Sequence, residues 1–134
     1  MTKDELLEIL SLGEDYYTEF KQKVSASLTR ELVAMANASG GRIFIGIDDS
    51  NKVKGVEFSN SVHSLIQDLA NNCDPSVGIS IETFENIIIV HVKEGANKPY
   101  SCSDGFYLRV GPNSQKLSRD EIIQFLKKRG ESEI

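Results

Sequence analysis

Four carboxylates beside predicted strands are the residues of this sequence best suited to chemistry. Glu14 and Glu19 flank the strand predicted around "DYYTE", and Asp48 and Asp49 follow the apolar run "RIFIGI". If the two strands are neighbours, three or four carboxylates converge at one end of a sheet, and a cation or a proton must separate them. Such oxygen ligands suit Mg²⁺ or Mn²⁺, which can position a water for phosphodiester hydrolysis. Acidic residues at strand ends are also common in solvated loops, so a surface role stays open.

The glycines near this run do not indicate a nucleotide-binding loop. A dinucleotide fingerprint or a P-loop needs a strand, then glycines, then a helix, whereas here a predicted helix precedes Gly40 and Gly41 and a strand follows them. No GxxxxGK[ST] motif occurs. We expect Gly40 and Gly41 to end the helix, and Gly46 to mark the close approach of another element.

Histidines and cysteines give no sign of a zinc site. Neither His63 nor His91 shows ligand spacing with the cysteines, and Cys73 and Cys102 lie far apart with no C-x-x-C motif. We expect two free thiols rather than a disulfide.

Basic residues gather in three short segments of an acidic chain. The net charge is −5 and the sequence pI is about 5.0, so a nucleic-acid-binding surface would have to be local. The clusters are Lys21 with Lys23, Lys52 with Lys54, and the "KKR" segment at 127–129. The first two clusters are as compatible with a solvated surface as with binding, and the third, at the end of a predicted helix where cations suit the helix dipole, fits a solvated surface better.

The elements that must position these residues follow from periodicity and capping. Capping boxes at Thr2 and Ser118 predict helices over 1–12 and 118–130, and apolar stripes predict two more from about Ser27 and around 62–69. Strands are predicted at 16–20, in "RIFIGID", in a hairpin of "ISIETF" and "IIIVHV", and in "FYLRVG", with a loop over "EGANKPYSCSDG". This order predicts one α+β domain over 1–134, with a mixed, largely antiparallel sheet packed with helices.

Four segments in fixed order resemble the Schlafen AlbA_2 domain family, also described as a divergent AAA or Alba-like DNA-binding domain. They are "EDYYTEFKQ", "ELVAMANASGGRIFIGIDDSNKVKGV", "KPY" and "FYLRVG", which together span 14–111. The resemblance implies an α+β domain of transcriptional-regulator type that binds nucleic acid, DNA or RNA. The residues expected to contact nucleic acid are Lys21, Asn37, Gly40, Gly41, Arg42, Lys52, Lys54 and Arg109.

The same resemblance leaves an enzymatic alternative. Schlafen nucleases cleave structured RNA such as tRNA with carboxylates that map onto Glu14, Glu19 and Asp48, with Asp49 as a substitute for Asp48, and a Mg²⁺ or Mn²⁺ cofactor. Without a P-loop, ATPase activity has no support. The paired lobes of the relatives imply a homodimer here. The absence of a signal peptide and of an apolar run of about 20 residues leads us to expect a cytoplasmic protein.

Overall fold

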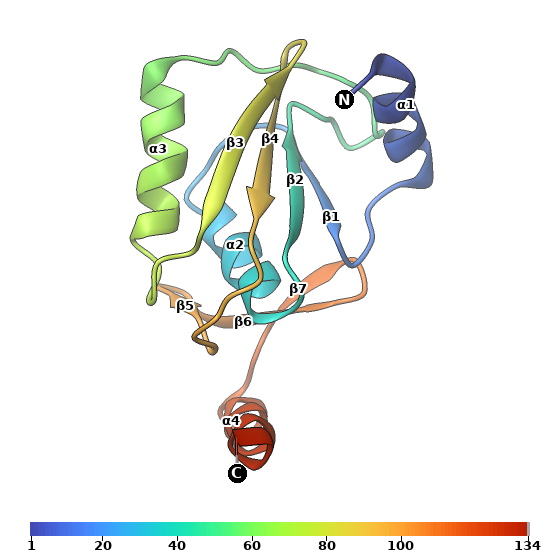
Figure 1. Cartoon of the computed structure of the whole chain (residues 1–134). Helices are drawn as coiled ribbons and strands as arrows, with labels where there is room; N and C mark the ends of the chain where they lie inside the picture. Colours follow the sequence, from blue (N-terminus) through green and yellow to red (C-terminus); the bar gives the residue numbers. More distant parts are fainter. Residues whose placement is uncertain (134) are drawn as a thin grey trace.

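A four-stranded sheet with helices on both faces forms the body of the molecule in the computed structural model (Figure 1). The structure describes the backbone of residues 1–133 and the side chains of residues 1–129. The sheet has the order β1-β2-β4-β3, made of β1 (Thr18–Lys21), β2 (Gly41–Ile45), β4 (Ile87–Val92) and β3 (Ile79–Phe84). Strands β1 and β2 are parallel, and the other neighbours are antiparallel. The expected α+β fold is therefore confirmed.

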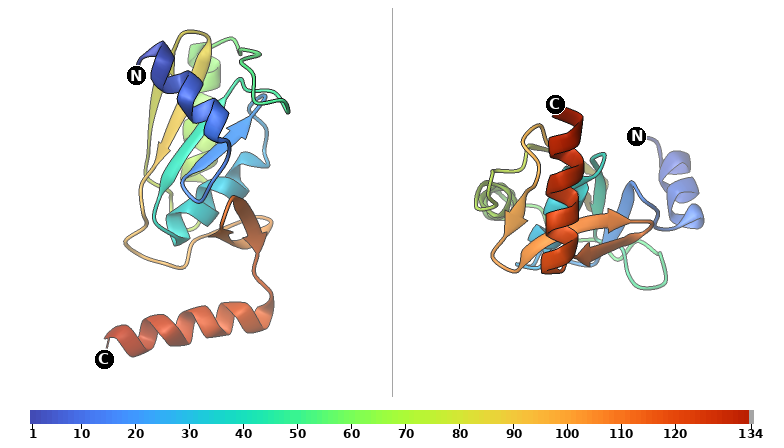
Figure 2. Two further views of the ribbon diagram at one scale, coloured as in Figure 1. Left: turned by 90° about the vertical axis from the view of Figure 1, so that its right-hand side faces the viewer. Right: turned by 90° about the horizontal axis from the view of Figure 1, so that it is seen from below.

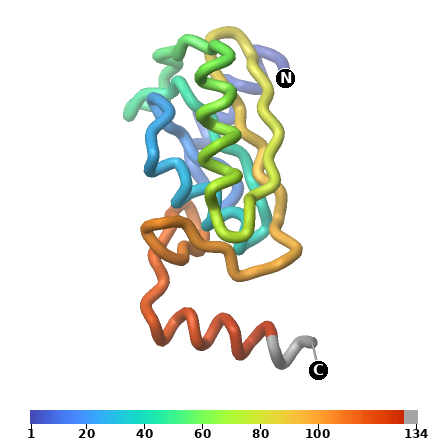
Figure 3. The backbone as a smooth tube through the Cα atoms, turned by 90° about the vertical axis from the view of Figure 1, so that its left-hand side faces the viewer, coloured from blue at the N-terminus to red at the C-terminus, as the bar shows by residue number. Residues whose placement is uncertain are grey.

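Strands β2 and β4 occupy the centre of the four-stranded sheet, and both are apolar on their two faces, as central strands usually are. Ile43, Ile45 and Val90 face a core that contains α2 (Leu28–Asn37) and α3 (Asn60–Asn71), and Figure 3 shows α3 lying along the sheet. Phe44 and Ile89 face the second core, which α1 (Lys3–Leu12) covers with two buried leucines. Both faces of the four-stranded sheet are thus closed by apolar packing.

A second, three-stranded sheet lies against α2, with the order β5-β6-β7. Its strands are β5 (Ser101–Cys102), β6 (Gly105–Val110) and β7 (Asn113–Lys116). Asp74, just beyond α3, forms an isolated antiparallel bridge with Ser101, and the two residues exchange both backbone hydrogen bonds at 2.8 Å. The bridge joins the end of α3 to β5.

The second sheet corrects two sequence-based expectations. The segment "EGANKPYSCSDG" is not entirely loop, because β5 lies within it, and "FYLRVG" is not the last strand, because β7 follows it. Both missed strands are short or polar: β5 has two residues and β7 reads "NSQK". Strand β1 also begins two residues later than expected, at Thr18.

Helix α4 (Arg119–Glu133) stands apart from the body, as the views in Figure 2 show. The capping box predicted at its start is confirmed: Ser118 Oγ accepts from the Glu121 amide at 3.2 Å, and a Glu121 carboxylate oxygen accepts from the Ser118 amide at 2.9 Å. The predicted cap at Thr2 is also present, since Thr2 Oγ1 accepts from the Glu5 amide at 3.1 Å. No helix among residues 1–133 is long and apolar enough to cross a membrane.

Candidate nucleic-acid interface

A hollow of about 540 Å³ opens where the parallel strands β1 and β2 end. Lys21 and Lys23 reach it from the end of β1, and Lys54 reaches it from the segment that follows β2. Gln22, Ser25, Gly55 and Val56 complete its lining, which contains no acidic residue in the described part of the chain. We name this site the lysine hollow.

Backbone hydrogen bonds hold the two walls of the lysine hollow together. The Lys21 carbonyl accepts from the Gly46 and Ile47 amides, at 2.7 and 3.0 Å, and the Gly46 carbonyl accepts from the Lys54 and Gly55 amides, both at 2.8 Å. Gly46 has φ +110°, and a Cβ there would lie 3.3 Å from Gly55 Cα. The close approach predicted at Gly46 is therefore present, and it brings Lys54 alongside β1.

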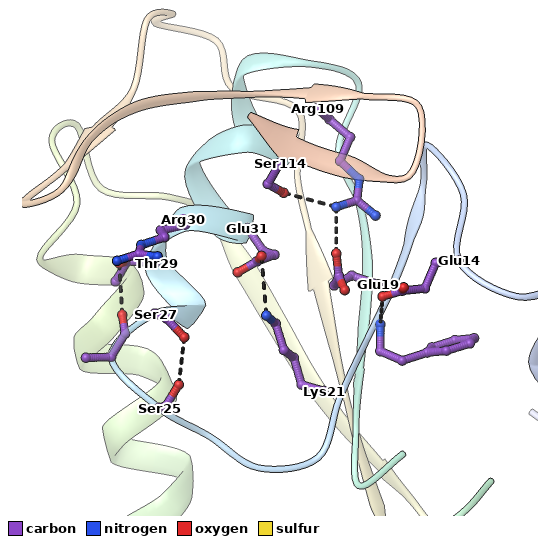
Figure 4. Close-up of polar contacts among 12 residues, drawn as sticks. Glu14, Glu19, Lys21, Ser25, Ser27, Thr29, Arg30, Glu31, Arg109 and Ser114 are labelled. Carbon is purple, nitrogen blue, oxygen red and sulfur yellow. Dashed lines mark hydrogen bonds and ion pairs between the residues drawn. The ribbon is translucent and has the colours of Figure 1, made fainter. Parts of the chain in front are cut away.

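The lysines of the hollow differ in how their charge is used. Lys21 Nζ lies 3.3 Å from a carboxylate oxygen of Glu31 on α2, so part of its charge is neutralised within the protein (Figure 4). Lys54 Nζ donates to the neutral amide oxygen of Gln22 at 3.1 Å. Within the described residues, neither Lys23 nor Lys54 forms an ion pair. Two cationic groups therefore remain available to an external anion.

Lys52 and Arg42 lie outside this hollow. Lys52 is exposed in the turn after β2, where its backbone amide donates to an Asp48 carboxylate oxygen at 2.9 Å. Arg42 lies near the start of β2, opposite the end that carries Lys21 and Lys54, and its guanidinium is 5.2 Å from the centroid of the Phe44 ring. Neither residue lines the hollow: Lys52 lies in the turn two residues before Lys54, and Arg42 lies at the other end of β2.

Arg109 does not offer its guanidinium to solvent. Its side chain has no exposed surface, and Nη1 donates to Glu19 at 2.7 Å and to Ser114 Oγ at 3.0 Å (Figure 4). Nη2 donates to the carbonyls of Asp15 and Thr18, both at 2.9 Å. In this conformation Arg109 joins β6 and β7 to β1, and a contact with nucleic acid would require these bonds to break.

The "NASGG" turn is also occupied by internal hydrogen bonds. The buried Asn37 amide group donates to the carbonyls of Tyr100 and Tyr107, each at 2.9 Å, and its oxygen accepts from the Tyr100 amide at 2.6 Å. The Gly40 amide donates to the Met35 carbonyl at 2.8 Å, and Gly41 begins β2. Asn37 thus links α2 to the second sheet, and its amide group and the Gly40 amide are engaged within the protein.

The structure brings two of the predicted carboxylates together. Glu14 accepts a hydrogen bond from the Phe20 amide at 3.0 Å, and its side chain lies beside that of Glu19 (Figure 4). Burial, together with the hydrogen bond and charge of Glu14, raises the pKa of Glu19 to about 7, although Arg109 opposes the shift. Glu19 therefore carries a proton in a substantial fraction of molecules at neutral pH, and this proton relieves its repulsion with Glu14.

Asp48 lies elsewhere, at the turn that follows β2. One of its carboxylate oxygens accepts hydrogen bonds from the amides of Ser50 and Lys52, both at 2.9 Å. Glu19, in contrast, pairs with Ile43 in the register of β1 and β2, so it lies before this turn. Asp49 is exposed in the same turn. No group of three His, Cys, Asp or Glu side chains is arranged to hold a metal ion within the described residues. The third ligand expected for the carboxylate pair is not beside it.

The family model of the Schlafen AlbA_2 domain matches residues 14–118. The chain belongs to the Schlafen AlbA_2 family. The match begins at Glu14 and ends at the connector before α4, so it covers both sheets and the lysine hollow. No match was found among curated proteins.

Two solved structures share the AlbA_2-like fold at low identity. The DIP2311 protein of Corynebacterium diphtheriae has a TM-score of 0.63 and 19% identity over 93% of this chain, which spans only 28% of that protein chain. The N-terminal domain of a protein related to the ATP-dependent DNA helicase RecG, from Nitrosomonas europaea, has a TM-score of 0.54 and 20% identity. This second comparison covers 86% of our chain and 92% of that domain. At such identities the likeness shows the fold alone.

Proposed function

We propose that this AlbA_2 domain binds the phosphate backbone of nucleic acid, as part of a DNA-binding protein of transcriptional-regulator type. The observation that carries the proposal is the lysine hollow, in which three lysines converge although the chain has a net charge of −5. A larger hollow of about 800 Å³ beside α4 mixes acidic with basic residues and is less suited to a polyanion. The likeness to a domain of a RecG-related protein supports the same function.

Lys23 and Lys54 carry the proposed contact, with Lys52 extending it along the exposed turn. Lysine ammonium groups act on phosphate as point charges and do not read base edges, so affinity should depend little on sequence. Lys21 has a second role, because its removal would leave the Glu31 carboxylate half-buried without its cation. Loss of binding in a Lys21 variant would therefore mix an interface effect with a folding effect.

The test compares two double variants with the same change in net charge. Lys23→Glu/Lys54→Glu reverses the charge of the lysine hollow, and Lys3→Glu/Lys116→Glu reverses two exposed lysines on α1 and β7. We expect the hollow variant to lose affinity for labelled duplex DNA and single-stranded RNA by at least about tenfold, and the control to lose much less. Fluorescence anisotropy measures both, and equal losses in the two variants would contradict the proposal.

A second candidate function, metal-dependent cleavage of structured RNA, rests on the Glu14 and Glu19 pair. Two adjacent carboxylates are a partial ligand set for Mg²⁺ or Mn²⁺, although Arg109 occupies one Glu19 oxygen and Asp48 lies apart. Incubation of labelled tRNA with and without Mn²⁺ tests it. Cleavage that requires Mn²⁺ and is lost in Glu14→Gln would establish this function, and absence of metal-dependent products would remove it.

We also propose that the protein acts as a homodimer. A single lysine hollow is small compared with the nucleic-acid-binding surfaces of specific complexes, and two copies would double the number of phosphate contacts. Sedimentation velocity distinguishes the chain mass of 14.9 kDa from twice that value.

A further inference from the structure

The lysine hollow lies at the carboxyl ends of two parallel strands that are joined through a helix. Strand β1, helix α2 and strand β2 follow one another in the chain and form a βαβ unit. The chain curves from Lys21, at the end of β1, through Ser25 towards α2 (Figure 4). Ligands commonly bind outside such strand ends, and the volume of about 540 Å³ lies within the range of about 300–1,000 Å³ for small-ligand pockets. A site of this size suits the end of a nucleic-acid strand better than a length of duplex.

The donors of the lysine hollow match a phosphate with two negative charges. Lys23 and Lys54 supply two ammonium groups that form no ion pair among the side chains that the structure describes, whereas Lys21 is paired with Glu31. The Gln22 amide oxygen accepts from Lys54 Nζ at 3.1 Å, so its amide nitrogen remains as a neutral donor. A terminal phosphate carries a charge of about −1.5 to −2 at pH 7 and three acceptor oxygens. A phosphate within a strand carries a single negative charge and matches this donor set less well.

Carboxylates lie next to the lysine hollow, outside its lining. Glu57 is exposed and directly follows Val56, which lines the hollow. Glu85 is exposed in the hairpin turn between β3 and β4, next to Asn86, whose carbonyl accepts from the Val56 amide at 2.8 Å. A strand that continued past the hollow in both directions would bring further phosphates towards these negative charges. A strand that ends in the hollow leaves it on one side only and avoids part of this repulsion.

We propose that the lysine hollow holds the terminal phosphate of a nucleic-acid strand, a phosphomonoester, in preference to a phosphodiester within the strand. Lys23 and Lys54 neutralise the two charges of this phosphate, and the Gln22 amide nitrogen donates to one of its oxygens. Lys21 adds a positive charge that Glu31 partly offsets. This inference rests on the nucleic-acid binding proposed above, and it names the part of the strand that the site takes.

The test compares strands that differ only at their ends. A short single-stranded DNA of fixed sequence, labelled on an internal base, is prepared with a 5′-phosphate, with a 3′-phosphate, with hydroxyl groups at both ends, and as a closed circle. We expect one of the two phosphorylated strands to bind at least about tenfold more tightly than the hydroxyl-ended strand and the circle, as measured by fluorescence anisotropy. The same comparison identifies which end of the strand the hollow takes.

A pair of glutamine variants assigns the preference to the lysine hollow. Gln22→Glu keeps the shape of the side chain but places a carboxylate beside Lys54, where it repels a phosphate, so the preference for a phosphorylated end should be lost. Gln115→Glu, at an exposed position of β7 outside the lining of the hollow, makes the same change in net charge and should keep the preference. Lys23→Ala and Lys54→Ala should each reduce the preference, because each removes one of the two unpaired cations.

The outcomes separate this inference from the proposed function. Equal affinity of the wild type for phosphorylated and hydroxyl-ended strands overturns the inference and leaves nucleic-acid binding intact. Absence of binding to every strand overturns the proposed function, and the inference with it. A preference that persists in Gln22→Glu means that the terminal phosphate binds outside the hollow, which overturns the assignment of the site. A phosphoserine peptide that binds as tightly as the preferred strand overturns the assignment to nucleic acid.

Discussion

The guanidinium of Arg109 joins three segments that are distant in the chain: β6, which carries it, Ser114 in β7, and the region from Asp15 to Glu19. Replacement by methionine keeps much of the side-chain volume but leaves the Glu19 carboxylate and two carbonyls without their donor. We expect Arg109→Met to lower the free energy of unfolding by about 3–5 kcal/mol, measured by urea denaturation.

The matched control for Arg109 is Arg30, whose ion pair with Asp104 is exposed on the surface. Arg30→Met should change stability little, because exposed pairs are screened by solvent. If Arg109→Met is as mild as Arg30→Met, the buried network does not stabilise the second sheet. Partial recovery of stability in Arg109→Met/Glu19→Leu would confirm that the cost comes from the unpaired carboxylate.

Glu19 should make the stability of the fold depend on pH near neutrality. Burial and Glu14 raise its folded pKa to about 7 from the ordinary 4.5, so between these values the folded state binds more protons than the unfolded state. Stability from this group is therefore present at low pH and declines as the pH rises from about 4.5 to 7. Glu19→Gln removes this titration, so the free energy of unfolding of the variant minus that of the wild type should increase as the pH rises from about 4.5 to 7. A difference that is independent of pH would contradict the assignment, and thermal unfolding at several pH values measures it.

Sequence reasoning selected the right elements for several site residues but misjudged how their side chains are used. Lys21 and Lys54 were expected at an interface and do meet at one hollow, because parallel pairing of β1 and β2 places their ends together. Arg109 was expected to contact phosphate, although alternation in β6 puts it on the same face as the buried Tyr107. That alternation was the available signal for its burial. Lys23 was noted as part of a cluster, but only the folded chain shows that it shares the hollow with Lys54.

At the scale of elements, the passage from α2 to β2 depends on glycine. Gly40 has φ +80°, and a Cβ there would lie 2.7 Å from the Val92 carbonyl oxygen in β4. Gly111 also has positive φ, +55°, but a Cβ there would meet no atom within 4 Å. An alanine at either site would be strained by the positive φ, but only at Gly40 would its Cβ also clash with a neighbouring atom.

We therefore expect Gly40→Ala to be less stable than Gly111→Ala by about 1–3 kcal/mol, the range for overpacking of a tight site. Urea denaturation of the two variants gives the comparison. Equal losses would mean that the backbone at Gly40 can move away from β4 without cost, which would contradict the close packing of this turn.

Elements with a strong local signal were predicted well, and those without one were missed. Capping boxes located α1 and α4, and the isoleucine-rich strands identified the centre of the sheet and its hairpin. Strand β7 is polar and β5 has two residues, so neither carries a periodic pattern; they form because β6 and α2 offer partners distant in sequence. Local propensity does not predict such tertiary pairing.

At the scale of the whole molecule, a small basic site on an acidic protein limits how strongly binding can depend on salt. If two or three lysines contact phosphates, the plot of log affinity against log salt for duplex DNA should have a slope between about −2 and −3. Lys54→Ala should reduce the slope by about one, while Lys116→Ala should leave it unchanged. A much steeper wild-type slope would require an interface larger than the lysine hollow.

The bridge between Asp74 and Ser101 has a chemical consequence for their neighbours. Cys73 and Cys102 are the chain neighbours of these two residues, and the two thiols lie close enough for Cys102 to act on the ionisation of Cys73. A disulfide needs the two Cα atoms within about 4.4–6.8 Å, and we propose that the bridge holds the two segments close enough for this bond to form. Burial and the nearby Cys102 raise the pKa of Cys73 to about 11, so the more accessible Cys102 should react first.

Diamide, a thiol-specific oxidant, should therefore join the two sulfurs within one chain, taking up the two protons and two electrons that the thiols release. The bond would connect the end of α3 to β5 and raise the melting temperature reversibly, while Cys102→Ser should show no shift. Thiol titration and non-reducing electrophoresis follow the reaction, and only intermolecular products would contradict it. Because two backbone hydrogen bonds hold the two cysteine segments together, the stability of this fold would then depend on the redox state of its surroundings.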